Sequence, residues 1–125
     1  MPKISRETAQ VDDPGFLVDR FGELGDYSVD FITFHEDLDA TPILKGLPDD
    51  RCQCPHWGYV TKGRLTYRFA DHEEVFEAGD AFYLPPGHIP VGNEPGSETV
   101  QFSPTKELRK TQEVMRRNAQ AMQPS

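Results

Sequence analysis

The sequence predicts an all-β domain, a sandwich or barrel of antiparallel strands, with one α-helix at the C-terminal end. Short segments rich in valine, isoleucine, phenylalanine and tyrosine recur about every ten residues, and glycine, proline and aspartate separate them. The C-terminal part differs, because residues 105–122 contain neither glycine nor proline. A chain of 125 residues is long enough to bury a hydrophobic core as one domain.

The N-terminal third predicts an arm, two strands and a long loop. Residues 1–15 are polar and end in an Asp-Asp-Pro-Gly turn, so we expect a loose arm or an edge contact. A short strand is expected at 16–18, followed by a turn at Gly22. Residues 27–35 are rich in β-formers and predict a second strand. We expect 40–50 to be a loop whose apolar side chains close one end of the barrel.

The middle of the chain predicts most of the sheet. One strand is expected from about Cys52 to Val60, followed by a Lys-Gly turn. Residues 64–69 alternate apolar and polar side chains, as a strand with one buried face does. Further short strands are expected at 75–76, 81–84, 88–91 and 98–102. The barrel domain is therefore predicted at 16–104, between the arm at 1–15 and a C-terminal helix and tail at 105–125.

The start of the C-terminal helix is predicted from its capping residues. Ser103 suits the N-cap position, and Pro104 suits the first helical position. Leu108 and Met115 belong to a narrow apolar stripe along the helix. We expect the helix to lie across the barrel or against a dimer partner, with a solvated helix as the alternative.

Charge and hydropathy exclude several classes of function. The net charge is −8 and the pI is about 4.9, and no dense cluster of basic residues is present, which argues against nucleic-acid binding. The same charge argues against binding to an anionic membrane surface. No apolar run approaches the roughly 20 residues of a membrane-spanning helix, and the first residues lack the apolar region of a secretory signal. We therefore expect a cytoplasmic protein.

Both cysteines lie close to a histidine, in Cys52-Gln-Cys54-Pro-His56. In an extended strand these three side chains would point to the same face. The two cysteines form a poor disulfide, because their Cα atoms would lie about 7 Å apart. They could instead be metal ligands, a redox pair or small buried side chains.

Two segments resemble the conserved motifs of the cupin superfamily. Residues 79–87, Gly-Asp-Ala-Phe-Tyr-Leu-Pro-Pro-Gly, resemble the second motif, and residues 59–63, Tyr-Val-Thr-Lys-Gly, resemble the end of the first. The resemblance covers residues 46–104. It implies a cupin jelly-roll barrel (a double-stranded β-helix) with a ligand pocket inside, often lined by a metal, and a homodimer.

The metal ligands of the family do not match this sequence one by one. His56 stands where the first motif has glutamate, and the two histidines before it have no counterpart. Pro90 stands where the second motif has histidine, while His88 lies two residues earlier with the same strand parity. A displaced site is therefore predicted, made of Cys52, Cys54, His56 and His88.

The chemistry of this set favours zinc first and iron second. Thiolate and imidazole are the ligands that zinc prefers, and four of them suit its tetrahedral geometry. The alternatives are that both cysteines are only buried side chains and that His88 caps a turn. We expect Trp57, Tyr67 and Tyr83 near the pocket, where a tyrosine hydroxyl would supply one polar group.

Three functions follow from these expectations. The first is a cupin that binds a small molecule, with a divalent metal, in the barrel pocket. The second is a metal-free sensor or binding module, or a structural cupin without activity. The third is a metal-dependent enzyme of the isomerase, dioxygenase or lyase type that acts on a small organic acid or a sugar derivative.

Overall fold

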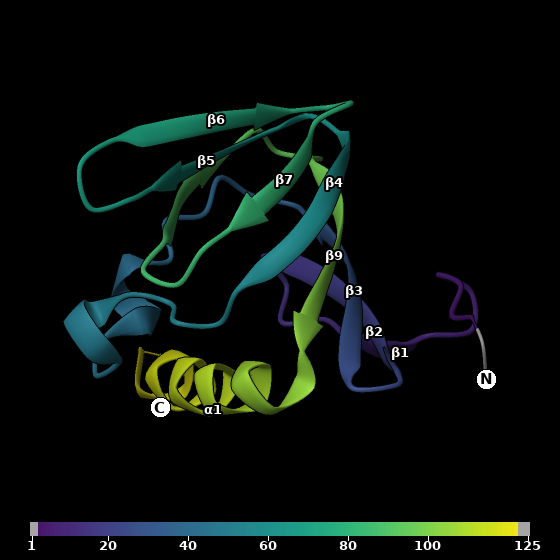
Figure 1. Ribbon diagram of the computed structural model, residues 1–125, viewed down its shortest axis with the longest axis horizontal. Coiled ribbons are helices and arrows are strands. Elements are labelled where there is room, and N and C mark those ends of the chain that lie inside the picture. The colour runs from purple at the N-terminus through teal and green to yellow at the C-terminus, as the bar shows by residue number, and fades with distance from the viewer. Residues whose placement is uncertain (1–2, 123–125) are drawn as a thin grey trace.

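The computed structural model describes residues 3–122 as two antiparallel sheets that face each other, with a helix beneath them (Figure 1). The larger sheet has the strand order β1-β2-β3-β9-β4-β7, and the smaller has the order β6-β5-β8. No hydrogen-bonded ladder closes them into one continuous barrel in the described part of the chain. The strands are β1 (Gln10–Asp12), β2 (Leu17–Leu24), β3 (Tyr27–Phe34), β4 (His56–Lys62), β5 (Arg64–Arg68), β6 (Glu73–Glu77), β7 (Ala81–Leu84), β8 (Ile89–Asn93) and β9 (Glu98–Pro104). The prediction of an all-β jelly roll with a C-terminal helix is confirmed.

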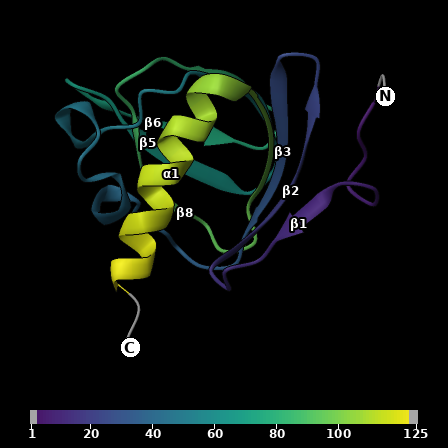
Figure 2. The ribbon, with the colours of Figure 1, turned by 90° about the horizontal axis from the view of Figure 1, so that it is seen from below.

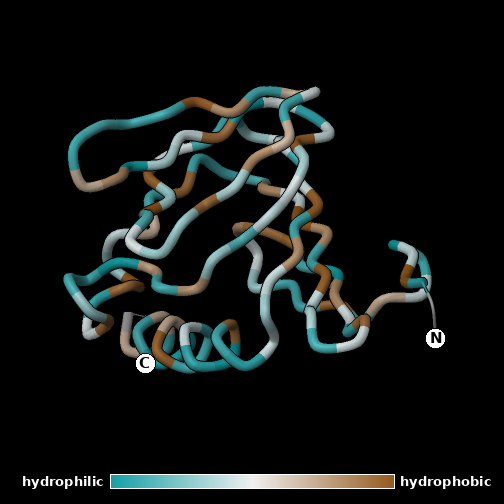
Figure 3. The backbone as a smooth tube through the Cα atoms, viewed as in Figure 1, coloured by the Kyte–Doolittle hydropathy of each residue, from teal (hydrophilic) through white to brown (hydrophobic). Residues whose placement is uncertain are grey.

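The space between the sheets has an apolar end and a polar end. On β3 and β4, Phe34 and Val60 face inward at one end and pack with four other core side chains: Leu65, Tyr67, Phe82 and Leu84. Asp30 and His56 are buried on the same faces of these strands, four residues away and at the opposite end. Alternation along the strand explains this arrangement, since every second residue points inward. Hydrophobic segments are distributed over both sheets (Figure 3).

The helix α1 (Thr105–Met122) lies beneath the open end of the two sheets (Figure 2). Its Leu108 packs in a second apolar cluster with Leu44, Ile89 and both cysteines. Leu44 belongs to the 3-10 turn η1 (Thr41–Leu44), which the turn η2 (Pro48–Asp50) follows. The segment 40–50 does close one end of the barrel, as predicted, but through these two turns and not as an irregular loop. Among the described residues no helix is long and apolar enough to cross a membrane.

Two local predictions are wrong. Gly22 lies inside β2, an eight-residue strand, and is not a turn. A side chain there would have to displace the end of the Ile4 side chain, so glycine lets the N-terminal arm pack closely on β2. Ser103 is not a helix cap, because β9 continues through Pro104 and the serine hydroxyl is used inside the barrel. The helix begins at Thr105, whose hydroxyl is hydrogen-bonded to that of Ser28 at 2.8 Å.

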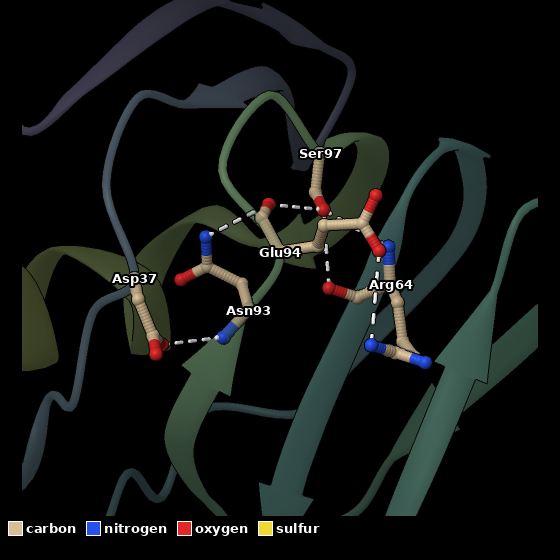
Figure 4. A network of polar contacts seen from close by, with 5 residues as sticks. All are labelled: Asp37, Arg64, Asn93, Glu94 and Ser97. Carbon is tan, nitrogen blue, oxygen red and sulfur yellow. Dashed lines mark hydrogen bonds and ion pairs between the residues drawn. The ribbon is translucent and has the colours of Figure 1, made fainter.

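A network of hydrogen bonds closes the apolar end of the barrel (Figure 4). The buried Ser97 hydroxyl accepts the Arg64 backbone N–H at 2.9 Å and lies 2.6 Å from the Glu94 carbonyl. Asn93 donates its backbone N–H to Asp37 at 3.0 Å. These contacts tie the β4–β5 turn to the β8–β9 loop and to the segment that follows β3. They lie at the far end of β4 from His56.

Candidate metal centre

Three side chains from separate segments converge at the polar end of the barrel. One ligand atom each from Cys52, His56 and His88 lies within 4.8 Å of the other two. The Cys52 Sγ atom is 3.7 Å from His56 Nε2, and the centroids of the two imidazole rings are 5.1 Å apart. All three residues are buried, with 5%, 6% and 1% of their surfaces exposed. The arrangement is a compact set of one sulfur and two nitrogen ligands.

A bend in the chain makes this convergence possible. The sequence predicted one extended strand from Cys52 to Val60, but β4 begins only at His56. In an extended strand, residues four positions apart would be separated by about 13 Å. The chain instead bends at Cys54, before Pro55, which returns Cys52 toward the imidazole of His56. The predicted strand is therefore wrong at its start.

Backbone hydrogen bonds join Cys52 to His88. The Cys52 N–H donates to the His88 carbonyl at 3.0 Å, and the Gly87 N–H donates to the Cys52 carbonyl at 2.8 Å. The two residues form an isolated antiparallel bridge outside the named strands. Gly87 has φ of +99°, which glycine adopts readily, so the Pro-Pro-Gly turn places His88 beside Cys52.

Each imidazole is oriented by a hydrogen bond at Nδ1. His88 Nδ1 donates to the Pro85 carbonyl at 2.8 Å, because a carbonyl oxygen can only accept. His56 Nδ1 is 2.6 Å from the Ser103 hydroxyl on β9. Metal-binding histidines usually hold one ring nitrogen in this way while the other binds the ion. Both Nε2 atoms are therefore free to act as ligands.

Burial keeps the cluster uncharged in the absence of a metal. It lowers the pKa of His56 to about 3, with a further contribution from the neighbouring His88, and it also lowers the pKa of His88. Burial raises the pKa of the Cys52 thiol to about 11. At neutral pH the set consists of two neutral imidazoles and one thiol, and the thiol must lose its proton to bind a metal.

The other predicted site residues are not part of the ligand cluster, although Tyr67 lies beside it. Cys54 is fully buried but is absent from the ligand cluster, and its Sγ is 3.4 Å from the Pro55 carbonyl. Tyr67 is buried with its ring edge-on to His88, at a centroid distance of 6.1 Å. Trp57 and Tyr83 stack on each other on the outer face of the large sheet, where 42% and 50% of their surfaces are exposed. Strand alternation explains this, since each directly neighbours an inward-facing residue.

Sequence reasoning missed Ser103, Asp19 and Asp30. Ser103 was assigned to the helix N-terminus, and nothing in the sequence placed its hydroxyl on His56. The two aspartates lie on β2 and β3 and share the polar end of the barrel. To predict that these aspartates point inward, one would have needed the register of the two strands, which the sequence alone does not provide.

A surface depression elsewhere on the molecule has none of the three cluster residues in its lining. It has a volume of about 730 Å³ and lies between the β2–β3 turn and the first turns of α1, where Glu23, Tyr27 and Arg109 line it. It is broad and open. We therefore base the functional argument on the buried ligand cluster and not on this depression.

The fold matches solved structures across most of the chain. A Rhizobium leguminosarum protein of unknown function matches with a TM-score of 0.61 and 20% identity, over 82% of this chain and 95% of that one. An RmlC-like cupin from Shewanella frigidimarina matches with a TM-score of 0.58 and 18% identity, over 83% and 95% of the two chains. The chain has the cupin fold. The polyketide cyclase RemF from Streptomyces resistomycificus is also similar to this chain, with a TM-score of 0.59 and 13% identity over 83% and 79% of the chains. No protein-family model and no curated protein matches its sequence.

Proposed function

We propose that this cupin binds a small molecule in its barrel together with a divalent metal ion held by Cys52, His56 and His88. The observation that carries the proposal is the spacing of the ligand atoms. In a tetrahedral zinc site with ordinary Zn–S and Zn–N distances, a sulfur and a nitrogen ligand lie about 3.6 Å apart. The separation between Cys52 Sγ and His56 Nε2 is 3.7 Å, so these two side chains fit zinc with little rearrangement.

The donor set favours zinc over iron. Thiolate with imidazole suits zinc, whereas the iron of non-haem oxygenases is usually held by two histidines and a carboxylate. Three protein ligands leave one tetrahedral position for the small molecule or water, as catalytic zinc sites do. A bound metal would supply Lewis acidity to a ligand oxygen. Ser103 and the Pro85 carbonyl would hold the two imidazoles in orientation.

A small-molecule ligand is supported by the polar end of the barrel. Buried polar side chains gather there on β3, β4 and β9: Ser28, Asp30, His56, Gln101 and Ser103. A barrel filled only for stability would be expected to bury apolar side chains at these positions. One structural neighbour is a polyketide cyclase, an enzyme that acts on an organic small molecule, and this agrees with the proposal.

The test compares two cysteine variants of the same chain. Untagged protein purified without chelator is expected to contain one zinc per chain. Cys52→Ser and His56→Ala are expected to lose it. Cys54→Ser is the matched control, because Cys54 is equally buried but is absent from the ligand cluster, and it should retain the metal.

Cobalt gives a second readout of the same site. Cobalt added to the metal-free protein should produce the near-ultraviolet absorption of a cobalt–thiolate bond in the wild type and in Cys54→Ser, but not in Cys52→Ser. Metal-free wild-type protein that also takes up no cobalt would refute the metal site and favour the metal-free binding module, in which the histidines are hydrogen-bonding groups.

We also propose that the protein is a homodimer, formed through the outer face of the large sheet. Five aromatic side chains with 40–50% of their surfaces exposed lie there on adjacent strands: Tyr27, Trp57, Tyr59, Tyr83 and Phe102. The register sets Trp57 directly opposite Phe102 on β9 and Tyr83 on β7, so the rings form one patch. At about 200 Å² per ring, they expose about 450 Å², more than half of the roughly 800 Å² that each partner buries in a standard interface.

A second copy is the occupant that this patch suits best. The chain carries a net charge of −8, yet the patch contains only uncharged aromatic rings, so a second acidic chain can approach there with the least repulsion. Trp57 is the only tryptophan, so its fluorescence reports on the patch directly. Dilution of a dimer should shift the emission of Trp57 to longer wavelength as the mass from light scattering falls by half.

Two variants with matched exposure test the location of the interface. Tyr83→Arg should weaken the dimer, whereas Val75→Arg on β6 should not, although both side chains are 50% exposed. A wild-type protein that is monomeric at all concentrations, or a dimer that survives Tyr83→Arg unchanged, would contradict this interface.

A further inference from the structure

Two aspartates lie side by side on the inner face of β2 and β3, and neither is one of the three metal-ligand side chains. Asp30 on β3 has only 2% of its surface exposed and pairs across the ladder with Gln101 on β9. Asp19 on β2 pairs with Ile32, and Asp30 pairs with Phe21, so the two aspartates are diagonal neighbours on one face. Ile32 on this face packs against the apolar core, which identifies the face as the inner one.

The two carboxyl groups interact with each other and lack other partners. The Asp30 carboxyl is close enough to raise the pKa of Asp19 further, beyond the effect of burial. In the described part of the chain, Asp19 Oδ1 and Asp30 Oδ2 are buried and receive no hydrogen bond from another residue. Neither carboxyl forms an ion pair with a lysine, arginine or histidine among residues 3–122.

No positive group in the described chain balances a negative charge on this pair. Burial and the mutual repulsion of the two groups raise the pKa of Asp19 to about 9, and burial also raises that of Asp30. Loss of one proton from the pair leaves a buried negative charge, and a bound cation would favour that loss. Buried charges in proteins are normally paired, because desolvation is costly. The missing counter-charge points to a ligand.

We propose that the Asp19–Asp30 pair is a subsite that binds the ammonium group of the small molecule in the barrel. An ammonium group supplies the positive charge and three hydrogen-bond donors to two carboxyl groups. A hydroxyl group would supply a donor but no charge. A metal ion would need more ligands, and no third histidine, cysteine or acidic residue of the described chain joins this pair in a ligand cluster.

The class of the ligand follows when the metal-ligand cluster and the aspartate pair are considered together. This step rests on the proposed function, because it uses the divalent ion at Cys52, His56 and His88. A divalent ion with one thiolate keeps a net positive charge, which suits a carboxylate. The aspartate pair is negative once it has lost one proton. The barrel therefore suits a zwitterion, a molecule with a carboxylate at one end and an ammonium group at the other.

A series of amino acids of increasing length tests this pairing of charges. The probes are glycine, 3-aminopropanoate, 4-aminobutanoate and 5-aminopentanoate, each compared with the acid of the same chain length that lacks the amine. Calorimetry on zinc-loaded protein is expected to show one length that binds about tenfold or more tightly than its matched acid, as expected for a charged hydrogen bond. Asp30→Asn should remove this preference and retain the zinc.

A second measurement separates this inference from the metal proposal. Ethylammonium, which has no carboxylate, is added to metal-free wild-type protein and to Asp19→Asn, and the carboxyl carbon signals are followed by NMR. The wild-type signals of Asp19 and Asp30 should shift, and the remaining Asp30 signal in the variant should shift less. If zinc binds but no amino acid is preferred over its matched acid, or if the preference survives Asp30→Asn, the ammonium subsite is refuted and the metal site is not affected. If no zinc binds, the ethylammonium titration still decides whether the pair binds an ammonium group.

Discussion

Replacing Ser103 by alanine removes the hydrogen bond at Nδ1 of the His56 ring. The hydroxyl lies 2.6 Å from His56 Nδ1, and Ser103 is fully buried, so water cannot readily replace it. An unpaired buried ring nitrogen costs about 1–3 kcal/mol of folding free energy. For a domain of this size, a loss of about 2 kcal/mol lowers the melting temperature by roughly 6–10 °C.

The same substitution should weaken zinc binding. Loss of a group that orients a metal-binding histidine typically reduces affinity by about 10–100-fold, or about 1.4–2.7 kcal/mol. Competition with a chromophoric chelator measures this affinity, and thermal unfolding with and without chelator measures the stability. Zinc should consequently stabilise the variant less than the wild type, because binding to the folded state adds less free energy at the same concentration.

Ser97 provides a matched control for this experiment. It is also a fully buried serine with hydrogen bonds, to Arg64 and Glu94, but it lies at the far end of the barrel. Ser97→Ala should lower the stability by a similar amount and leave the zinc affinity unchanged. Equal losses of affinity in both variants, or unchanged affinity in Ser103→Ala, would refute the role assigned to Ser103.

Two further predictions concern a turn and the pH dependence. Gly63 has φ of +78° and its Cα faces Ser97, so Gly63→Ala should lower the free energy of unfolding, measured with urea, by about 2–4 kcal/mol. Gly79 has φ of +99° but open space around it, so Gly79→Ala should lower it by only about 1 kcal/mol. Equal losses in the two variants would contradict the packing argument. The pKa of Asp19 in the folded protein, about 9, lies above its ordinary value of 3.8. Its contribution to stability is therefore complete below pH 3.8 and is lost as the pH rises toward 9. The folded pKa of His56, about 3, lies below its ordinary 6.5, so its contribution is lost as the pH falls below 6.5. Metal-free protein should therefore lose stability between about pH 6.5 and 9, by up to about 1.4 kcal/mol per pH unit for one proton. Chemical unfolding at several pH values measures this slope, and Asp19→Asn should flatten it. An unchanged slope in Asp19→Asn would contradict the assignment.

The sequence by itself determined the fold class and the positions of most turns. Strand alternation and glycine-containing turns depend on the residues next to one another, so they can be recognised without the tertiary structure. The glycines of the two cupin-like motifs, Gly63, Gly79 and Gly87, all have positive φ, which suits tight turns at these positions. Alternation along the chain also predicted that Cys52, Cys54 and His56 share one face. All three are buried.

Only the tertiary structure decided which of those side chains meet. A bend at Cys54 and a bridge to His88 bring Cys52 to His56, while Cys54, although buried in the same apolar cluster as Cys52, is not one of the converging ligand side chains. Contacts of this kind depend on segments far apart in the chain, whose register and bends no local pattern specifies.

The same reason explains the residues that sequence analysis placed wrongly or missed. Ser103 precedes a helix and fits an N-cap pattern, but pairing of β9 with β4 turns its hydroxyl toward His56. Asp19 and Asp30 resemble ordinary surface aspartates until the register of β2 and β3 places both inside the barrel. Local chemistry indicated the fold and all three residues of the candidate metal cluster, together with Cys54, which is not part of it. Long-range strand pairing selected the side chains that complete the polar interior.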